Sequence, residues 1–293
     1  MKWFSFIRSL NQELVERNLA NRNQSILIAS SGGQDSACLL QAINKLRPYW
    51  GWSLAIASCD HAWFDAKPRS CSQVGQLAWH NQTKYYQSIA PTRALGEAKA
   101  RSWRYDSLAR IGQTHGYSLV FTGHTASDRA ETLLYTIIRG SSQVGLQSLS
   151  WKRKLHFDVC LVRPMLTITR SLSAKICKKE KLCITLDRSN QRSEWHRNRV
   201  RKRVLPYLRQ YFNPKVDQVL CQLAELAHGE TCYLDGLCKS LQFKIQLQRQ
   251  NLGCLPLSLQ RRFLYCYFKR EQARQTFLSI EFARFSLLKI FNY

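Results

Sequence analysis

The sequence predicts an α/β protein with a doubly wound parallel sheet, followed by a small helical domain. Two observations support this fold class. Short apolar segments alternate with segments of helical periodicity between residues 25 and 140, as in chains that form parallel sheets. Beyond residue 206, amphipathic helical patterns follow one another without intervening strands. We therefore predict a catalytic domain at 1–205 and a helical C-terminal domain at 206–293.

The predicted elements begin with a short apolar strand, SILIA, which leads through a glycine-rich turn into a periodic helix, ACLLQAINKL. Gly140 should end a later helix, because glycine readily adopts the left-handed conformation of helix ends. Ligands bind at the carboxyl ends of parallel strands, so the turns that follow the strands are the expected site. The predicted elements are strand 25–29, helix 37–46, strand 53–61, strand 84–90, helix 95–116, strand 117–124 and helix 127–140.

Basic residues far outnumber acidic ones. Forty-four Lys and Arg against nineteen Asp and Glu give a formal net charge of +25, which favours a polyanionic partner such as nucleic acid. The segment 151–215 alone holds eighteen basic and four acidic residues, a net +14. No segment reaches the roughly 20 apolar residues of a membrane span, and the N-terminal segment lacks the apolar stretch of a signal peptide. We expect neither membrane insertion nor secretion.

Eleven cysteines are scattered between Cys38 and Cys266, and no two have CxxC spacing. Their number is odd, and a chain of 293 residues does not need disulfides to be stable. We therefore predict reduced thiols. A zinc site, an iron-sulfur cluster or a thioredoxin-like pair has no support in this spacing.

The strongest motif is the loop SGGQDS at 31–36, between a predicted strand and a predicted helix. Glycines let a phosphate approach the backbone, successive N–H groups form an anion cradle, and the helix N-terminus favours negative charge. The patterns GxxxxGK(S/T) and GxGxxG are both absent, so this is not one of the commonest nucleotide loops. An ordinary glycine-rich turn is the alternative, and the loop's position together with Asp35 and Ser36 argues against it.

This loop resembles the SGGxDS loop of the PP-loop ATP-pyrophosphatases, which have an adenine nucleotide alpha hydrolase-like fold. The resemblance implies cleavage of ATP between the α and β phosphates, with pyrophosphate held in the loop. The segment TGHTASDRAET at 122–132 resembles the HxxDDxxET signature of the tRNA(Ile)-lysidine synthases. The segments 139–146 and 163–164 resemble that family's RGS…GL and RP motifs. The chain departs from the signature at Ser127, where Asp is usual, and at Arg129, where Gln is usual.

Asp128 and Glu131 are three residues apart, so on a helix their carboxylates project from one face. Such a face can position an amine and accept its proton. The alternative is that both are first-turn acids that interact favourably with the helix dipole. The segment 97–105 resembles the family's ExxAR..RY helix, and the pair at 60–61 resembles its DH pair near the nucleotide.

The resemblance thus implies two sets of site residues, with ATP and Mg²⁺ as cofactors. Asp35 is the candidate ligand for Mg²⁺. The predicted ATP-binding residues are Ser31, Gly32, Gly33, Gln34, Asp35, Ser36, Asp60 and His61. The predicted catalytic and lysine-binding residues are Arg104, His124, Asp128 and Glu131.

The basic segment contains two further stretches that resemble this family, DRSN at 187–190 and RNRVRKRVLP at 197–206. Arginine side chains suit phosphates, and Trp195 beside them suits an unpaired base. A solvated helix face is the usual explanation of a charge run, but it poorly explains so large an excess of one sign. The predicted tRNA-binding residues are Arg197, Arg199, Arg201, Lys202 and Arg203.

The resemblance implies ATP-dependent ligation of free lysine to C2 of the wobble cytidine of a CAU-anticodon tRNA(Ile), through an adenylated intermediate. The rivals are a PP-loop tRNA thiolase, whose best-known families depend on cysteines, a PP-loop amidotransferase or NAD synthetase, and a non-catalytic tRNA-binding relative. The form HTASDRAETLLY resembles the cyanobacterial and plastid branch, so we expect a chloroplast location, with the bacterial cytoplasm as alternative. A homodimer is a further expectation.

Overall fold

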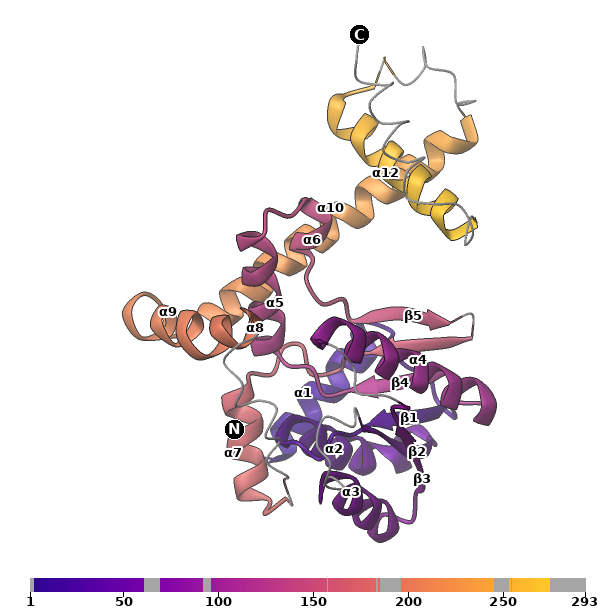
Figure 1. Cartoon of the computed structure of the whole chain (residues 1–293), viewed down its shortest axis with the longest axis vertical. Coiled ribbons are helices and arrows are strands. Elements are labelled where there is room, and N and C mark those ends of the chain that lie inside the picture. The colour runs from indigo at the N-terminus through magenta and orange to yellow at the C-terminus, as the bar shows by residue number, and fades with distance from the viewer. Residues whose placement is uncertain are drawn as a thin grey trace. The chain divides into compact units, whose positions relative to one another are not determined.

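A computed structural model describes residues 3–60, 69–91, 96–156, 158–182, 184, 196–244, 253 and 255–274 (Figure 1). The chain divides into two compact units, Met1–Ala224 and Glu225–Tyr293. The second unit contains most of α10 (Val216–Lys244) and all of α12 (Leu257–Arg274). Both are helices, as the amphipathic patterns in this part of the sequence predict.

The first unit is built on a six-stranded sheet in the described part of the chain, with the order β3-β2-β1-β4-β6-β5. Every neighbouring pair is parallel except β5 and β6, which are antiparallel. The strands are β1 (Ser25–Ala29), β2 (Ser53–Asp60), β3 (Lys84–Ile89), β4 (Leu119–Thr122), β5 (Lys152–His156) and β6 (Val159–Val162). The α/β, doubly wound fold class is therefore confirmed.

The strand order reverses between β1 and β4. From β1 the chain adds β2 and β3 on one side, and it then returns to place β4 on the other side of β1. Ala29 and Thr122, the last residues of these two strands, are paired in the ladder. Loops that leave two such neighbouring strand ends diverge and create the crevice in which α/β sheets bind ligands. The two strongest sequence motifs begin at this point.

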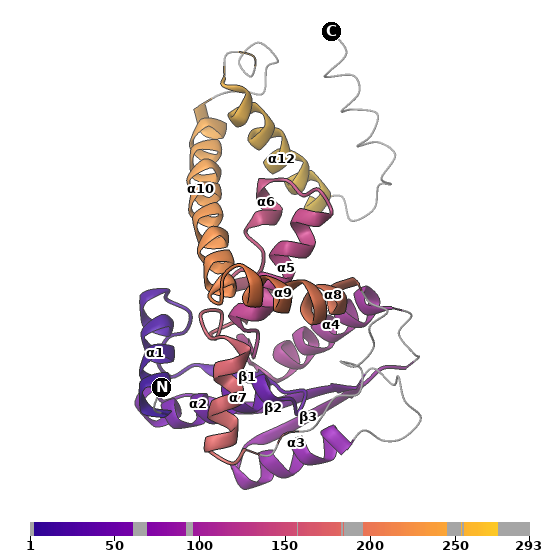
Figure 2. The ribbon, with the colours of Figure 1, turned by 90° about the vertical axis from the view of Figure 1, so that its left-hand side faces the viewer.

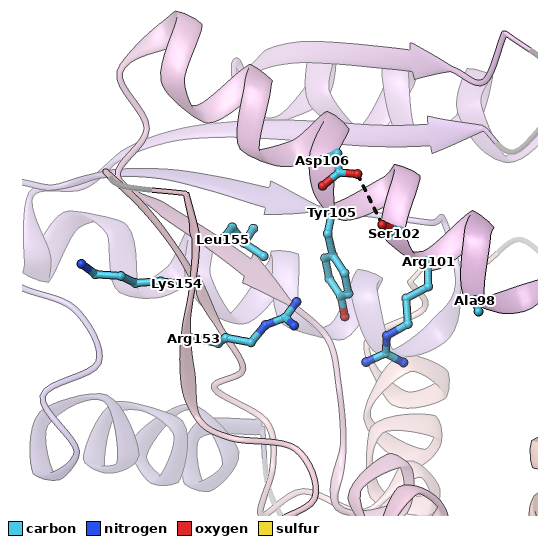
Figure 3. A pocket seen from close by; sticks show the side chains of 8 residues that line it. All are labelled: Ala98, Arg101, Ser102, Tyr105, Asp106, Arg153, Lys154 and Leu155. Carbon is cyan, nitrogen blue, oxygen red and sulfur yellow. Dashed lines mark hydrogen bonds between the residues drawn. The ribbon is translucent and has the colours of Figure 1, made fainter. Parts of the chain in front are cut away.

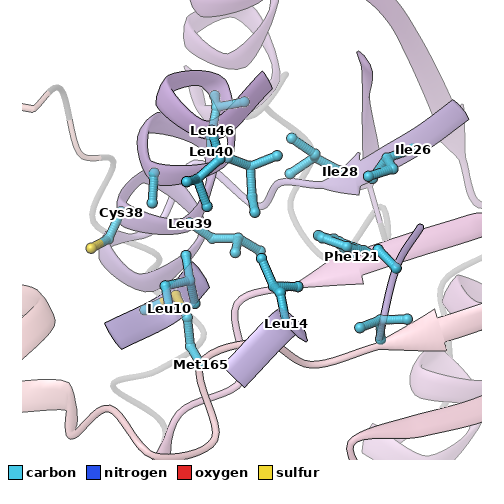
Figure 4. Close-up of a cluster of buried hydrophobic side chains, with 14 of the residues drawn as sticks. Leu10, Leu14, Ile26, Ile28, Cys38, Leu39, Leu40, Leu46, Phe121 and Met165 are labelled. Atoms are coloured by element: carbon cyan, nitrogen blue, oxygen red, sulfur yellow. The ribbon is translucent and has the colours of Figure 1, made fainter. Parts of the chain in front are cut away.

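Each face of the sheet has its own apolar core, because successive residues of a strand point to opposite faces. Ile26 and Ile28 pack with α1 (Trp3–Glu16) and α2 (Gln34–Trp50), as Figure 4 shows. Leu27, between them, packs on the other face with Leu108 of α4 (Glu97–His115). Figures 1 and 2 show α4 and α2 on opposite sides of the strands. The remaining helices of this unit are α3 (Arg69–His80), α5 (Ala126–Ile138), α6 (Gln143–Leu146), α7 (Arg170–Lys179), α8 (His196–Arg199), η2 (Val200–Val204) and α9 (Leu205–Tyr211).

The strands predicted from sequence are confirmed to within two residues at each end. Helix α5 ends at Ile138, and Gly140 has a φ of 71°, as its predicted role at a helix end requires. Helices α1 and α3 and the hairpin of β5 and β6 were not predicted from the sequence. β5 reads KRKLH, whose charged residues do not resemble the buried apolar strands of a parallel sheet, because it lies at the sheet edge.

The first compact unit extends beyond residue 205, the predicted end of the catalytic domain. Val216 and Leu220, in the first turns of α10, pack with the small apolar cluster of Ala130, Val200 and Leu205. The Cys221 thiol also donates to the carbonyl oxygen of Ala126, 3.3 Å away. The beginning of α10 is therefore part of the first unit. In the described residues, we find no helix with the length and apolar character that a membrane crossing needs.

Candidate active site

Hydrogen bonds between serine hydroxyls and backbone groups fix the conformation of the loop after β1. Gly32 has a φ of 74°, which favours glycine, and its N–H donates to the Ser30 hydroxyl 3.3 Å away. The Ser36 hydroxyl donates to the carbonyl oxygen of Gly33 at 2.8 Å, and Gly33 begins α2 without a side-chain cap. The first N–H groups of α2 thus lack a side-chain acceptor from the cap residue. A ligand phosphate can supply that acceptor.

Asp35, in the first turn of α2, is held by residues of α7. Its carboxylate lies 3.1 Å from the Arg170 guanidinium and accepts a hydrogen bond from the Ser173 hydroxyl. The Gln34 amide donates to the carbonyl oxygen of Arg170 at 2.9 Å and to Ser173 at 2.8 Å. Burial raises the pKa of Asp35, while Arg170 and Ser173 counteract that rise. Gln34 and Asp35 of the predicted loop are therefore held in position by α7, a helix almost 140 residues further along the chain.

Gly123 brings the loop after β4 against the loop after β1. A methyl group on its α carbon would lie 2.8 Å from the carbonyl carbon and oxygen of Asp35 and 2.9 Å from the Ser36 nitrogen. Real Cβ atoms do not approach backbone atoms so closely. The two motifs of the sequence analysis are thus in direct backbone contact, and only glycine fits between them.

Asp128 both completes the capping box of a helix and faces the loop site. Thr125 donates to its carboxylate from the backbone N–H and from the hydroxyl, each at 2.8 Å, in a capping box at the start of α5. Its other oxygen is 4.0 Å from Arg170, the residue that also contacts Asp35. Burial alone would raise the pKa of Asp128, but His124, Arg170 and Thr125 outweigh burial and lower it. Asp128 is therefore an anion, and Arg170 lies between it and Asp35.

Glu131 lies one turn further along α5 and is only 4% exposed. Arg201 approaches its carboxylate to 3.6 Å and Arg197 to 4.0 Å, while Arg197 also donates to the Thr132 hydroxyl at 2.6 Å. Burial, assisted by the negative charge of Asp128, raises the pKa of Glu131 to about 7 despite these arginines. The two acids on this face therefore differ in protonation, which suits them to different roles near neutral pH.

His124 lies at the end of β4, where its Nδ1 is 2.9 Å from the Thr122 hydroxyl. Burial lowers the pKa of His124 well below its usual value, and Arg163, Arg104 and Arg101 lower it further against the opposing effect of Asp128. The imidazole is therefore neutral at physiological pH. A neutral imidazole beside Asp128 can donate or accept one hydrogen bond without adding positive charge.

Ser127 and Arg129, the two residues that depart from the family signature, are both buried but lie in different surroundings. The Ser127 hydroxyl donates to the Asp217 carboxylate at 2.8 Å, and Asp217 is held by the Arg209 guanidinium at 2.9 to 3.2 Å. A carboxylate from α10 thus lies next to the position at which the signature has Asp. Arg129 is 2% exposed, and its side chain is among the largest fully buried ones.

The remaining predicted site residues lie in different places relative to Asp35, Asp128 and Glu131. Asp60 ends β2, and His61 lies outside the described residues, as do residues 187–190 and Trp195. Arg104 is half-buried on α4, 5.5 Å from the ring centroid of Tyr105. Arg197 and Arg201 contact Glu131, and their predicted contact with tRNA stays a prediction. Arg199, Lys202 and Arg203 are exposed.

Sequence reasoning missed Arg170 and Ser173. Both lie just after Thr169, whose hydroxyl accepts the N–H of Leu172 and caps α7. The capping threonine before a periodic segment was the available signal for this helix. It could not indicate that the helix reaches the loop after β1.

Comparison with known proteins agrees with this geometry. The PP-loop domain family matches residues 5–208. Chloroplastic tRNA(Ile)-lysidine synthase of Zygnema circumcarinatum is 39% identical, over 87% of this chain and 73% of the relative. The enzymes of the same name from Nostoc sp. and Gloeobacter violaceus are 38% and 42% identical, over 90% and 89% of this chain and 83% and 82% of theirs.

Among solved structures, the U34-tRNA thiolase NcsA of Methanococcus maripaludis, with its 4Fe-4S cluster, aligns with a TM-score of 0.63. It covers 77% of this chain and 79% of the thiolase at 13% identity, so the likeness concerns the fold alone. In the part of the chain that the structure describes, no group of three or more His, Cys, Asp or Glu residues is arranged to hold a metal ion. From the match to the domain and from these relatives, the chain belongs to the PP-loop family and, within it, to the tRNA(Ile)-lysidine synthases.

Proposed function

We propose that this protein ligates free lysine to C2 of the wobble cytidine of a CAU-anticodon tRNA(Ile). The C2 oxygen of the cytidine attacks the α phosphate of ATP, and pyrophosphate leaves. The ε-amine of lysine then attacks C2, the C2–O bond breaks, and the oxygen departs with AMP. The observation that carries the proposal is the contact of the phosphate loop with the carboxylate face, through Gly123 and Arg170.

The loop 31–36 binds the phosphates of ATP in this proposal. The first N–H groups of α2, which have no side-chain cap, bind the pyrophosphate end, and Arg170 stabilises negative charge that develops there. Mg²⁺ in such sites is held by one or two carboxylates together with substrate phosphates, and the buried carboxylate of Asp35 fits that requirement. When bound, the ion would neutralise the triphosphate.

Asp128 and Glu131 handle lysine. Asp128 is ionised and can bind the lysine ammonium, while Glu131, with a pKa of about 7, can take the proton that the amine must lose before it attacks. Arg197 and Arg201 orient the Glu131 carboxylate. The relatives in chloroplasts and cyanobacteria support a plastid, or alternatively a bacterial cytoplasm, as the compartment. The homodimer stays a prediction.

The assay that tests this function follows pyrophosphate release from purified protein, ATP and a CAU-anticodon tRNA, with and without lysine. We expect release to require the tRNA, and AMP release to require lysine as well. A tRNA thiolase would instead need a sulfur donor and be indifferent to lysine. Equal turnover without tRNA, or a lack of any turnover, would rule out the proposed reaction.

Glu131→Gln should slow lysine transfer more than adenylation, so adenylated tRNA should accumulate. In the wild type, kcat/KM for lysine should rise as pH increases through about 7, because the ionised carboxylate accepts the proton. The variant should lose this rise. Glu16→Gln, on the exposed surface of α1, is the control and should behave as wild type. An unchanged pH profile in Glu131→Gln would show that another group accepts the proton.

Replacing Lys202 and Arg203 together by Ala should weaken tRNA binding and leave the KM values for ATP and lysine unchanged. Both side chains are exposed beside α9, and each lost phosphate contact reduces the slope of log K against log[salt] by about 0.7 to 0.9. We therefore expect a slope flatter by up to roughly 1.8. The control replaces Lys178 and Lys179 by Ala, which removes the same charge at the exposed end of α7 and should change the slope by less. A wild-type slope in the variant that lacks Lys202 and Arg203 would show that the exposed segment after α8 does not contact tRNA.

A further inference from the structure

A pocket of about 410 Å³ lies between α4 and the edge strand β5, on the face of the sheet that α4 covers (Figure 3). Its lining includes Arg101 and Tyr105 of α4 and Arg153 of β5. Figure 3 shows Arg101 and Arg153 directed toward the hydroxyl end of Tyr105, whereas Lys154 points away. The pocket also has one acid, Asp106, which accepts a hydrogen bond from Ser102 at 3.4 Å.

Three guanidinium groups surround the ring of Tyr105. Arg153 lies 4.8 Å from the ring centroid, Arg101 5.4 Å and Arg104 5.5 Å. In the described part of the chain, none of the three forms an ion pair with a carboxylate. Positive charges that are not paired with carboxylates repel one another, so an anion that joins the cluster would stabilise it.

Tyr105 provides a second, independent sign of a ligand. The residue is 7% exposed, and the guanidinium of Arg163 approaches its hydroxyl without reaching good hydrogen-bond geometry. A buried hydroxyl that is not bonded in good geometry is costly, and an oxygen of a ligand would satisfy it. Burial would raise the pKa of Tyr105, but Arg101, Arg104 and Arg163 outweigh burial and lower it. The hydroxyl is therefore a strong donor for an oxygen that enters the cluster.

The cluster is electrostatically continuous with the carboxylate site. Burial lowers the pKa of Arg101, and the positive charge of Arg197, which contacts Glu131, lowers it further. Arg163, Arg104 and Arg101 likewise act on the pKa of His124. Positive charge thus extends from the face that holds Asp128 and Glu131 to the edge strand of the sheet.

We propose that this pocket binds a phosphodiester of the RNA strand that enters the active site, next to the nucleotide that is modified. The proposal rests on the proposed function and adds a subsite to it. Guanidinium forks suit phosphate oxygens, and the guanidinium groups around the Tyr105 ring leave it poorly placed to stack on a base. The exposed edge strand lets a long chain pass, which a buried small-molecule pocket would not need.

The test compares Arg153→Ala with Lys154→Ala, which removes the same charge from the neighbouring residue whose side chain points away. Binding of CAU-anticodon tRNA is measured over a range of salt concentrations. We expect Arg153→Ala to weaken binding about tenfold at low salt and to flatten the salt slope by about 0.7 to 0.9, because one charged contact is lost. Lys154→Ala should change the slope by much less.

Equal slopes in the two variants would overturn the proposal. It would also be overturned if Arg153→Ala raised the KM for lysine or ATP while tRNA binding stayed unchanged, since the pocket would then serve a small molecule. Binding does not require turnover, so the two proposals can fail separately. A wild-type protein that makes no lysidine, but whose tRNA binding depends on Arg153, would contradict the reaction and keep the subsite.

Discussion

Replacing Asp35 by Asn is expected to reduce tRNA-dependent pyrophosphate release by at least about 100-fold, the effect of losing one preorganised electrostatic group. The change keeps the size of the side chain and removes its charge. Arg170, 3.1 Å away, would lose the nearer of its two carboxylate partners, and the loop would lose its candidate Mg²⁺ ligand. Binding of tRNA should be nearly unchanged, because Asp35 is 8% exposed and lies in the nucleotide loop.

Asp158→Asn, an exposed acid in the turn between β5 and β6, is the matched control and should release pyrophosphate as the wild type does. Thermal unfolding of both variants checks that the fold is intact. A variant at residue 35 that cleaved ATP normally but no longer bound tRNA would contradict the assignment of the loop to the nucleotide.

Gly123→Ala should have a comparably large effect, although the change adds only a methyl group and removes no charge. The new atom would lie 2.8 Å from backbone atoms of Asp35, and neither the end of β4 nor the start of α2 can move without disturbing the core. Overpacking of this kind costs about 1 to 3 kcal/mol of stability. Pyrophosphate release should fall by a larger factor than stability explains, since the phosphate loop itself must shift.

Gly229→Ala, in α10, is the control, because a Cβ at that position meets nothing within 4 Å. There, alanine should be neutral or stabilise the helix by roughly 0.5 to 1 kcal/mol. Unfolding midpoints and pyrophosphate release are measured for both. Wild-type activity in Gly123→Ala would show that the contact between the two loops does not position the phosphates.

The parts of the site that the sequence predicts are those encoded in short segments. Residues 31–36 and 122–132 each carry a loop and the start of a helix, so their chemistry is visible in a few consecutive residues. The register of β1 and β4 then brings them together without further information. For Asp128, the structure agrees with the first-turn explanation, since its carboxylate completes the capping box of α5. Its role toward lysine stays a prediction.

The sequence could not show the long-range contacts. Arg170 reaches Asp35 from α7, and Arg197 and Arg201 reach Glu131 from the segment around α8. Their spacing relative to the acids follows from helix packing and not from local periodicity. The run of basic residues predicted RNA contacts for Arg197 and Arg201, but it gave no sign that the fold also places these two beside a buried carboxylate.

The most direct measurement is mass spectrometry of a CAU-anticodon tRNA after incubation with the protein, ATP and isotopically labelled lysine. Nuclease digestion should yield one nucleoside that is heavier than cytidine by a labelled lysine less water, at the wobble position only. Omitting ATP or lysine should abolish it, and Asp35→Asn should not form it. An unmodified wobble cytidine, with ATP consumed or not, would contradict the account. A gain of sulfur in a parallel incubation with a sulfur donor in place of lysine would point to thiolase chemistry instead.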